Sequence, residues 1–448
     1  MPSGDAAERS PNSPDRPSID PMQKTRNRRP NSRWPSAIRA GWRWVLTLGL
    51  LCACAGMASA EEPPITQHIL SLLEAEGFEN LHAEEDAEKR VLTIRFENRR
   101  YRWEVAGLGV LLALVSREYE GQLVVIPLHT GLPMARIEVS AADYRAFLRG
   151  ELEGAEFSSR MRVMPTSPES PSASARNASA GRVDIQFAPG LRVNLATPAP
   201  PGVFTGAEVR ANTSLAVQLG KGLAFEGTYV YPLSNSKPTF SRIAGTWNAR
   251  LGRNGYFQFQ GGRLSHELDG IAAQVSYLSD TGCHHAGASV AQASYPGWER
   301  TISHQLFYAW RPVGTDLTAT ISGGRYLRGD QGYSFSIHNG FAENGIEFFY
   351  TTTTLSRTTG VVFTVPLGWM RQPRPGPVRV RLKNAFGFVY TDERPRPLDG
   401  GLSVPFYDGY QTAIRRWTNA YLRTYVGQLR EAGMRWASEP GDGSHRMF

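Results

Sequence analysis

Between Val183 and Tyr390, apolar residues fall on every second position in one short segment after another. From Ala207 to Leu219, for example, one face carries mainly Val and Leu, and the other carries charged, amide and hydroxyl side chains. This period of two is typical of β-strands with one apolar and one wet face. A strand of about 9 to 11 residues spans a bilayer when tilted, and such strands must close into a barrel because lipid offers no hydrogen-bond partner to an open edge. A soluble all-β sandwich has similar strands, so the alternation alone leaves both folds open.

The segment from Val378 to Tyr390 shows the most regular alternation. All of its Val, Leu, Phe and Tyr residues except Val389 share one face, which places its three basic residues on the face that would line a lumen. Such a basic row would attract acidic sugars, or it would pair with Glu208, Glu226 or Glu347 across the barrel, and the sequence leaves both interpretations open. The candidate lumen-binding residues are Arg379, Arg381, Lys383, Arg210, Glu226 and Glu347.

Large aromatic residues recur on the apolar faces of these segments. Aromatic side chains of membrane barrels gather on the lipid-facing surface, in girdles near both interfaces. We therefore expect outward positions, rather than sugar-binding platforms, for Trp247, Trp310, Phe348, Tyr350, Phe386 and Tyr390.

The first 60 residues have the features of an export leader. A region rich in Arg, Pro and Ser runs into a short apolar core from Trp44 to Ala55, and Ala58-Ser59-Ala60 forms a small-x-small cleavage site. This order predicts a secretory signal peptide whose apolar core is too short for a comfortable transmembrane helix. We expect residues 1–60 to be leader and signal peptide, with translation starting at Met1 or Met22.

Charge and cysteine content narrow the class of protein further. Much of the net charge of +8 comes from the basic leader, so we do not expect nucleic-acid binding. Of the three cysteines, two lie in the apolar core of the leader, so Cys283 remains alone and no intramolecular disulfide is expected. Beyond the leader no apolar run reaches about 18 residues, so no membrane-spanning helix is expected.

The part that follows the leader has a mixed rhythm. Residues 61–162 combine helical and strand periods and predict a small α/β domain in the periplasm. Its expected helices cover residues 65–75 and 108–120, and its expected strands cover residues 90–96, 101–105 and 123–128.

Three further parts follow. Residues 163–181, dominated by Pro, Ser and Ala, predict a linker with too little apolar content to pack. Residues 182–411 predict an antiparallel outer-membrane β-barrel of about 12 strands, and even strand numbers are typical of bacterial barrels. Residues 412–448 predict an amphipathic helix or closing strands. The expected fold class is therefore mainly β, with the barrel preceded by the α/β domain.

Late in the chain, glycine-rich segments resemble a known family. The run from Gly324 to Gly332 (Gly-Arg-Tyr-Leu-Arg-Gly-Asp-Gln-Gly) and the later Asp-Gly-Gly turn at residues 399–401 resemble the YjbH family of outer-membrane exopolysaccharide proteins. The resemblance covers residues 63 to 405. Its motif residues are Gly324, Arg325, Tyr326, Leu327, Gly329, Asp330, Gly332, Asp399, Gly400 and Gly401.

The resemblance implies a function and a set of partners. It implies a non-enzymatic outer-membrane component of exopolysaccharide secretion or assembly, with the α/β domain in the periplasm. Full-length members are similar to two barrels in one chain, whereas this sequence resembles the α/β domain and the second barrel. Together with the basic row, this gives as expected partners membrane lipids, an acidic exopolysaccharide, periplasmic or lipoprotein export partners, and a separate first-barrel chain.

Signals of other chemistry are weak. No nucleotide-binding loop or nucleophile elbow stands out, and no cofactor is expected. Cys283-His284-His285 has metal-ligand residue types, but three adjacent residues rarely converge on one ion, so no metal is expected. Polysaccharide hydrolysis needs two carboxylates facing each other across a sugar, and sequence does not place Glu226 and Glu347 that close. Two alternatives stay open: a general porin or structural barrel without a polysaccharide role, and a periplasmic polysaccharide-modifying enzyme.

Overall fold

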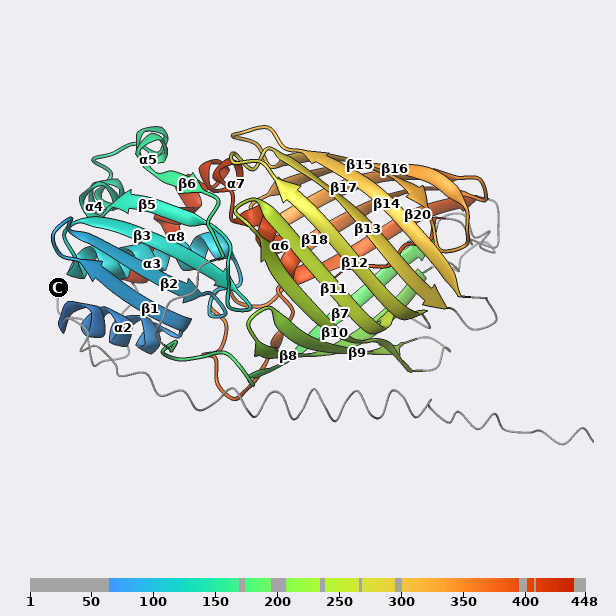
Figure 1. Cartoon of the computed structure of the whole chain (residues 1–448), viewed down its shortest axis with the longest axis horizontal. Helices are drawn as coiled ribbons and strands as arrows, with labels where there is room; N and C mark the ends of the chain where they lie inside the picture. Colours follow the sequence, from blue (N-terminus) through green and yellow to red (C-terminus); the bar gives the residue numbers. More distant parts are fainter. Residues whose placement is uncertain are drawn as a thin grey trace, which may run out of the picture. The chain divides into compact units, whose positions relative to one another are not determined.

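The structure is a computed structural model (Figure 1) and describes residues 64–168, 174–194, 207–233, 238–265, 268–294, 300–394, 401–406 and 408–438. The predicted leader, residues 1–60, lies outside the described residues. The described chain forms an α/β domain followed by a closed β-barrel, which confirms the expected fold class.

The α/β domain is built on one mixed sheet. Its strands lie in the order β1-β2-β3-β5-β6, with β4 paired to β3; β2 and β3 run parallel and the other neighbours run antiparallel. The strands are β1 (Glu79–Asp86), β2 (Val91–Glu97), β3 (Gln122–His129), β4 (Leu132–Pro133), β5 (Arg136–Ser140) and β6 (Arg162–Met164). The helices are α2 (Pro64–Glu76), α3 (Glu104–Glu118), α4 (Ala141–Arg149) and α5 (Gly154–Arg160).

Helix α3 is the centre of this domain. All its residues from Val105 to Ser116 are buried, as expected for a helix that is apolar on every side and lies inside a core. The predicted helix over residues 108–120 is confirmed, with an earlier start. The predicted strand over residues 101–105 is wrong: Trp103 has the extended backbone of an N-cap residue, and the helix begins at Glu104.

Three C-terminal helices complete the same core. They are α6 (Asp408–Arg416), α7 (Asn419–Thr424) and α8 (Val426–Ser438), so this part of the chain is helical rather than a pair of closing strands. Leu429 of α8 is fully buried, and the hydroxyl of Tyr144 on α4 donates to the carbonyl of Gly109 on α3 at 2.8 Å. Among the described residues, no helix is both long and apolar enough to cross a membrane.

A histidine makes the stability of the α/β domain depend on pH. Burial of His82 on β1, with Arg95 nearby, lowers its pKa to about 4. Below its ordinary pKa of about 6.5, the unfolded chain binds a proton that the folded chain does not bind, so stability falls as pH drops from about 6.5 towards 4. We expect His82→Gln to weaken this dependence, as measured by thermal unfolding midpoints at pH 7 and pH 5. If the variant lost as much stability between pH 7 and pH 5 as the wild type, His82 would not be the cause of the pH dependence.

The barrel is a single sheet that closes on itself (Figure 1). Thirteen strands form the ring over the described residues. The first seven are β7 (Val183–Asn194), β8 (Ala207–Gly220), β9 (Leu223–Pro232), β10 (Thr239–Leu251), β11 (Gly255–Ser265), β12 (Leu268–Leu278) and β13 (His284–Ser294). The others are β14 (Thr301–Trp310), β15 (Leu317–Arg325), β16 (Gln331–Phe341), β17 (Asn344–Thr353), β18 (Arg357–Pro366) and β20 (Ala385–Arg394), with β19 (Val378–Leu382) preceding β20.

The seam of the barrel is parallel. From β7 to β18 each strand pairs antiparallel with the next, and β18 pairs antiparallel with β20. With an odd number of such strands, the first and last must point the same way. Accordingly β19 and β20, which act as one strand interrupted at Lys383 and Asn384, both pair parallel with β7. Thirteen strands agree with the expected number of about 12, but the number is odd, whereas bacterial barrels typically have an even number.

Alternation sets the two faces of the barrel wall. Along β12, for example, buried and exposed residues alternate over most of the strand. The outward face carries exposed Trp247, Trp310 and Phe348, the last with 59% of its surface accessible, so their predicted outward position is confirmed. Many Val, Leu, Ile, Phe and Tyr side chains share this face. The barrel thus has an apolar outer surface.

The two ends of the barrel differ. At one end, hairpins contact the α/β domain: Gly222 donates to the carbonyl of Thr130 at 2.7 Å, and Glu343 pairs with Arg102 at 2.7 Å. We call this end the near rim. Because successive hairpins lie at opposite ends of a meander, the turn between β15 and β16, residues 326–330, lies at the other end, which we call the far rim.

Candidate functional site

Two residues of the predicted basic row form ion pairs at the near rim. Arg379 faces inward with 3% of its surface exposed. Its Nε donates to Oδ1 of Asp184 on β7 at 2.8 Å, and its guanidinium also donates to the carbonyl of Arg99. The Nε of Arg381 lies 3.4 Å from Oδ2 of the same carboxylate. The row therefore pairs with Asp184, an acid that was not among the predicted partners.

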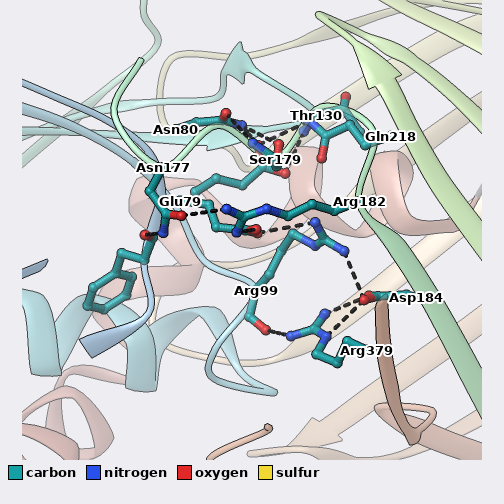
Figure 2. A network of polar contacts seen from close by, with 12 residues as sticks. Glu79, Asn80, Arg99, Thr130, Asn177, Ser179, Arg182, Asp184, Gln218 and Arg379 are labelled. Atoms are coloured by element: carbon teal, nitrogen blue, oxygen red, sulfur yellow. Dashed lines mark hydrogen bonds and ion pairs between the residues drawn. The ribbon is translucent and has the colours of Figure 1, made fainter. Parts of the chain in front are cut away.

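The pairing continues into the α/β domain (Figure 2). Arg99 lies between two acids, with one guanidinium nitrogen 2.9 Å from Asp184 and another 3.2 Å from Glu79 of β1. Arg182, just before β7, also bonds to Glu79 and to the side chain of Asn177. Burial raises the pKa of Glu79, and the positive charges of Arg99 and Arg182 oppose this rise.

A second set of contacts lies beside the first (Figure 2). Glu97, at the end of β2, accepts hydrogen bonds from the backbone of Thr130 and Gly131 at 3.0 Å each. It also accepts from the side chains of Asn80 and of Gln218 on β8. A carboxylate of the α/β domain therefore bonds directly to the barrel wall.

The end of the predicted linker belongs to this arrangement. Ser179 is fully buried, and its hydroxyl accepts from Nδ2 of Asn80 at 2.7 Å while its backbone donates to Oδ1 of Asn80 at 3.0 Å. The backbone of Arg176 exchanges two hydrogen bonds of 2.9 Å with Leu81. Residues 176–182 are thus held in place by hydrogen bonds, although this segment has too few apolar side chains to pack.

We call this set the junction network. It consists of Glu79, Asn80, Glu97, Arg99, Ser179, Arg182, Asp184, Gln218, Arg379 and Arg381. Glu79 and Asp184 each contact at least two guanidinium groups, so both buried carboxylates are paired with groups of opposite charge, as burial requires. The arrangement fixes the α/β domain to the near rim.

The third residue of the basic row lies elsewhere. Lys383 lines a lumen cavity of about 600 Å³ together with Arg210. The cavity is bounded by strands β7 to β10, β17, β18 and β20, and its polar lining includes Asn212, Ser214, Thr228, Ser241, Thr358 and Thr391. Two basic groups among hydroxyl and amide groups form a surface suited to a ligand that is rich in hydroxyls and carries negative charge.

The two predicted acidic residues are placed apart. Glu226 on β9 pairs with Arg242 on β10 at 2.9 Å. Glu347 lies on β17 directly opposite His338 of β16. The strands β9 and β17 are not neighbours, so the two carboxylates do not belong to one cross-strand pair.

A segment that follows β20 enters the lumen. At the far rim, the backbone of Gly401 donates to Oδ2 of Asp330 at 2.7 Å, and Leu327 donates to the carbonyl of Leu402 at 2.9 Å. Leu327 and Asp330 belong to the run that resembles the YjbH family, and Gly401 belongs to its Asp-Gly-Gly turn. The two motif segments are therefore bonded to each other; Asp399 and Gly400 lie outside the described residues.

The same segment continues to the near rim. Along β11, Gln260 donates to the carbonyl of Pro405 at 2.8 Å. Helix α6 follows: the hydroxyl of Tyr410 donates to the carbonyl of Ala249 at 2.9 Å, close to the near-rim end of β10. Arg416, the last residue of α6, pairs with Glu104 of α3 in the α/β domain at 2.8 Å. We call residues 401–406 and 408–416 the C-terminal strap, because they run through the lumen from rim to rim.

Small side chains make room for the strap. Alanines occupy inward positions of β10, β12 and β13 in this seat, and Val404 packs among them with Leu402 and Phe406. The buried residues of this seat are Ala244, Leu264, Leu268, Ala272, Ala291, Ala293 and Leu327. The strap is thus seated on the side of the lumen formed by β10 to β13, whereas the cavity that Arg210 and Lys383 line is bounded mainly by β7 to β9, β17, β18 and β20.

Sequence reasoning missed Asp184 and the strap. Asp184 is a single acid at the start of a strand, and its partner Arg379 is 195 residues away, so no local pattern joins them. In the strap, Leu402, Val404 and Phe406 alternate with other residues, which is also the signal of a β-strand. The alternation was visible, but its period does not distinguish a paired strand from an extended segment inside a lumen.

The comparisons with known proteins gave one family. Residues 228–380 match the model of the YjbH family, described as "Exopolysaccharide biosynthesis protein YbjH", over about a third of the chain. The match lies inside the range on which the resemblance was based and confirms it. Comparisons with curated proteins and with solved structures gave no match.

Proposed function

We propose that this chain, whose residues 228–380 match the model of the YjbH exopolysaccharide biosynthesis family, is an outer-membrane component of exopolysaccharide secretion or assembly. One observation carries the proposal: the matched residues form the barrel wall from β9 to β19. That wall is apolar outside and polar inside, which is the arrangement of a barrel that spans a bilayer around a wet lumen. The chain acts here without catalysis, by providing a path or a scaffold for the polymer.

Partners follow from the surfaces described. The outer apolar surface contacts membrane lipid, and the α/β domain lies in the periplasm, where it meets further export proteins or a separate first-barrel chain. We expect the polymer to be acidic, because negatively charged sugars would complement the positive charges of Arg210 and Lys383, which line the lumen cavity.

Cell fractionation tests the location. In the native host, we expect the chain in the outer-membrane fraction, extractable with detergent and with a gel mobility that shifts on boiling, as a closed barrel requires. Deletion of the gene should reduce secreted polymer, and the wild-type gene should restore it. Recovery in the soluble periplasmic fraction would contradict the membrane assignment, and unchanged polymer would contradict the polysaccharide role.

A charge placed on the outer surface tests whether a single residue of the barrel faces lipid. Leu306, in the middle of β14, is 68% exposed on the outward face. We expect Leu306→Arg to destabilise the membrane-embedded barrel by about 2 to 4 kcal/mol, because arginine near the bilayer midplane is costly. Leu355→Arg is the control, since this exposed leucine lies in the turn between β17 and β18. Urea unfolding in lipid vesicles measures both; equal effects would contradict a lipid-facing position for Leu306.

A further inference from the structure

Five neighbouring strands carry polar, uncharged side chains at directly opposed positions inside the barrel. Asn248 on β10 is paired in register with Gln258 on β11, which is paired with Gln274 on β12. Gln274 is paired with Ser289 on β13, and Ser289 with Gln305 on β14. Cross-strand partners share one face of a sheet, so these five side chains form one continuous row. We call it the amide row.

The amide row faces the lumen rather than the membrane. Asn248 and Gln258 are each 1% exposed, and Gln274 is 9% exposed, whereas their outward neighbours Trp247 and Val275 are exposed. The row begins close to the near-rim end of β10 and lies near the middle of β14. It therefore follows the lumen obliquely, as a row perpendicular to tilted strands must.

Several polar atoms of the row have no partner among the described residues. They are both side-chain polar atoms of Asn248 and Nε2 of Gln305. Thr246, two residues before Asn248 on the same face, also has an unpaired hydroxyl. Buried polar groups are normally hydrogen-bonded, so unpaired amides that face a lumen indicate a surface built to bind something else.

The strap supplies hydrogen-bond partners to part of the amide row and to a residue beside it. Gln411 of α6 donates from Nε2 to Oε1 of Gln258 at 2.9 Å. Next to the row, Gln260 donates to the carbonyl of Pro405. The strap thus presents the polar groups that a hydroxyl-rich chain would present at the same place.

We propose that the amide row is a binding site for the hydroxyl groups of a sugar chain, and that the C-terminal strap occupies this site until the sugar chain displaces it. The inference rests on the proposed function and names the lumen surface that takes the polymer. An amide offers two donors and one acceptor oxygen, and a sugar hydroxyl both donates and accepts, so the two match without any charge. The row binds the neutral part of the polymer, while Arg210 on β8 and Lys383 between β19 and β20 lie outside the row.

Single-channel conductance of the full chain in a planar bilayer tests the proposal. Val404→Asp places a charge among the alanines of the seat and should unseat the strap. We expect it to lengthen the open time about tenfold or more, because a buried unpaired carboxylate is strongly unfavourable. Maltohexaose, a neutral sugar chain, should then block the current. Gln411→Leu, which removes only the bond to Gln258, is a milder second variant and should lengthen the open time in the same direction.

The amide row is tested on the Val404→Asp background. Asn248→Leu with Gln305→Leu should shorten each maltohexaose block about tenfold, since several hydrogen bonds to the sugar are lost. Gln186→Leu, an inward amide on β7 outside the row, is the matched control and should leave the block unchanged. Boiling-dependent gel mobility confirms that each variant is a folded barrel.

The outcomes separate the inference from the function on which it rests. Blocks that do not change when the amide row is altered, or strap variants that stay as closed as the wild type, would overturn the inference while the proposed function stands. Blocking by oligogalacturonate but not by maltohexaose would place sugar binding at the cavity that Arg210 and Lys383 line and would also overturn the inference. A chain that never inserts into the bilayer would overturn the proposed function together with the inference.

Discussion

Asp184→Asn is expected to lower the free energy of unfolding by about 3 to 5 kcal/mol, because it leaves buried guanidinium groups without their acid. Asp184 contacts Arg99, Arg379 and Arg381, and the side chain of Arg379 is almost fully buried. Asparagine keeps the shape of the side chain and removes its charge. Urea unfolding of the detergent-solubilised chain measures the loss, and limited proteolysis should show the α/β domain released from the barrel.

A second substitution makes this prediction specific. Arg379→Met added to Asp184→Asn removes a charge that the first change left unpaired, so the double variant should recover part of the lost stability. A double variant whose loss equals the sum of the two single losses would show that the pair is not coupled in the folded chain. The junction network would then not be what holds the α/β domain to the near rim.

Gly324→Ala is expected to destabilise the barrel by on the order of 3 kcal/mol, since alanine has no room and no favourable backbone conformation there. Gly324 has a φ of +150°, and a Cβ atom at this position would lie 2.2 Å from the carbonyl oxygen of His304 on the neighbouring strand. A backbone atom cannot move aside as a side chain can, so β14 and β15 would have to separate. The temperature at which gel mobility shifts measures the effect.

Gly245→Ala provides the control for this prediction. Gly245 lies on β10 of the same barrel, and a Cβ atom there meets nothing within 4 Å. Its substitution should leave the shift temperature near that of the wild type. Equal losses in the two variants would show that the barrel tolerates no added side chain on any strand, and that the close contact with His304 is not the cause.

Period-two alternation predicted the barrel wall well because the cause is local. Each residue faces either the lumen or the outer surface, and Val378, Val380 and Leu382 point outward as their spacing indicated. Strand number was harder to predict, because the parallel pairing of β19 and β20 with β7 leaves no mark in the sequence.

The candidate site could be predicted only in part. The sequence identified Arg210 and Lys383, which the structure brings together at one cavity. It also indicated that Arg379 faces inward. It did not identify Asp184 as the partner of Arg379, because pairing across the fold depends on which strands become neighbours. The amide row shows the same limit: Asn248 and Gln305 become parts of one row only through the register of four successive strand pairs.

The odd number of strands has a topological consequence for assembly. Because β7 and β20 both run from the near rim to the far rim, the chain leaves the last strand at the end away from the α/β domain. Yet Leu429 on α8 belongs to the core of that domain, so the chain must return, and in a membrane-embedded barrel lipid closes the outer route. The C-terminal strap makes this return through the lumen of the barrel. The chain is therefore threaded through its own barrel, an arrangement that folds usually avoid. The α/β core is therefore complete only once the wall has closed around its own C-terminal segment, so that correct barrel closure becomes a precondition for a finished α/β domain.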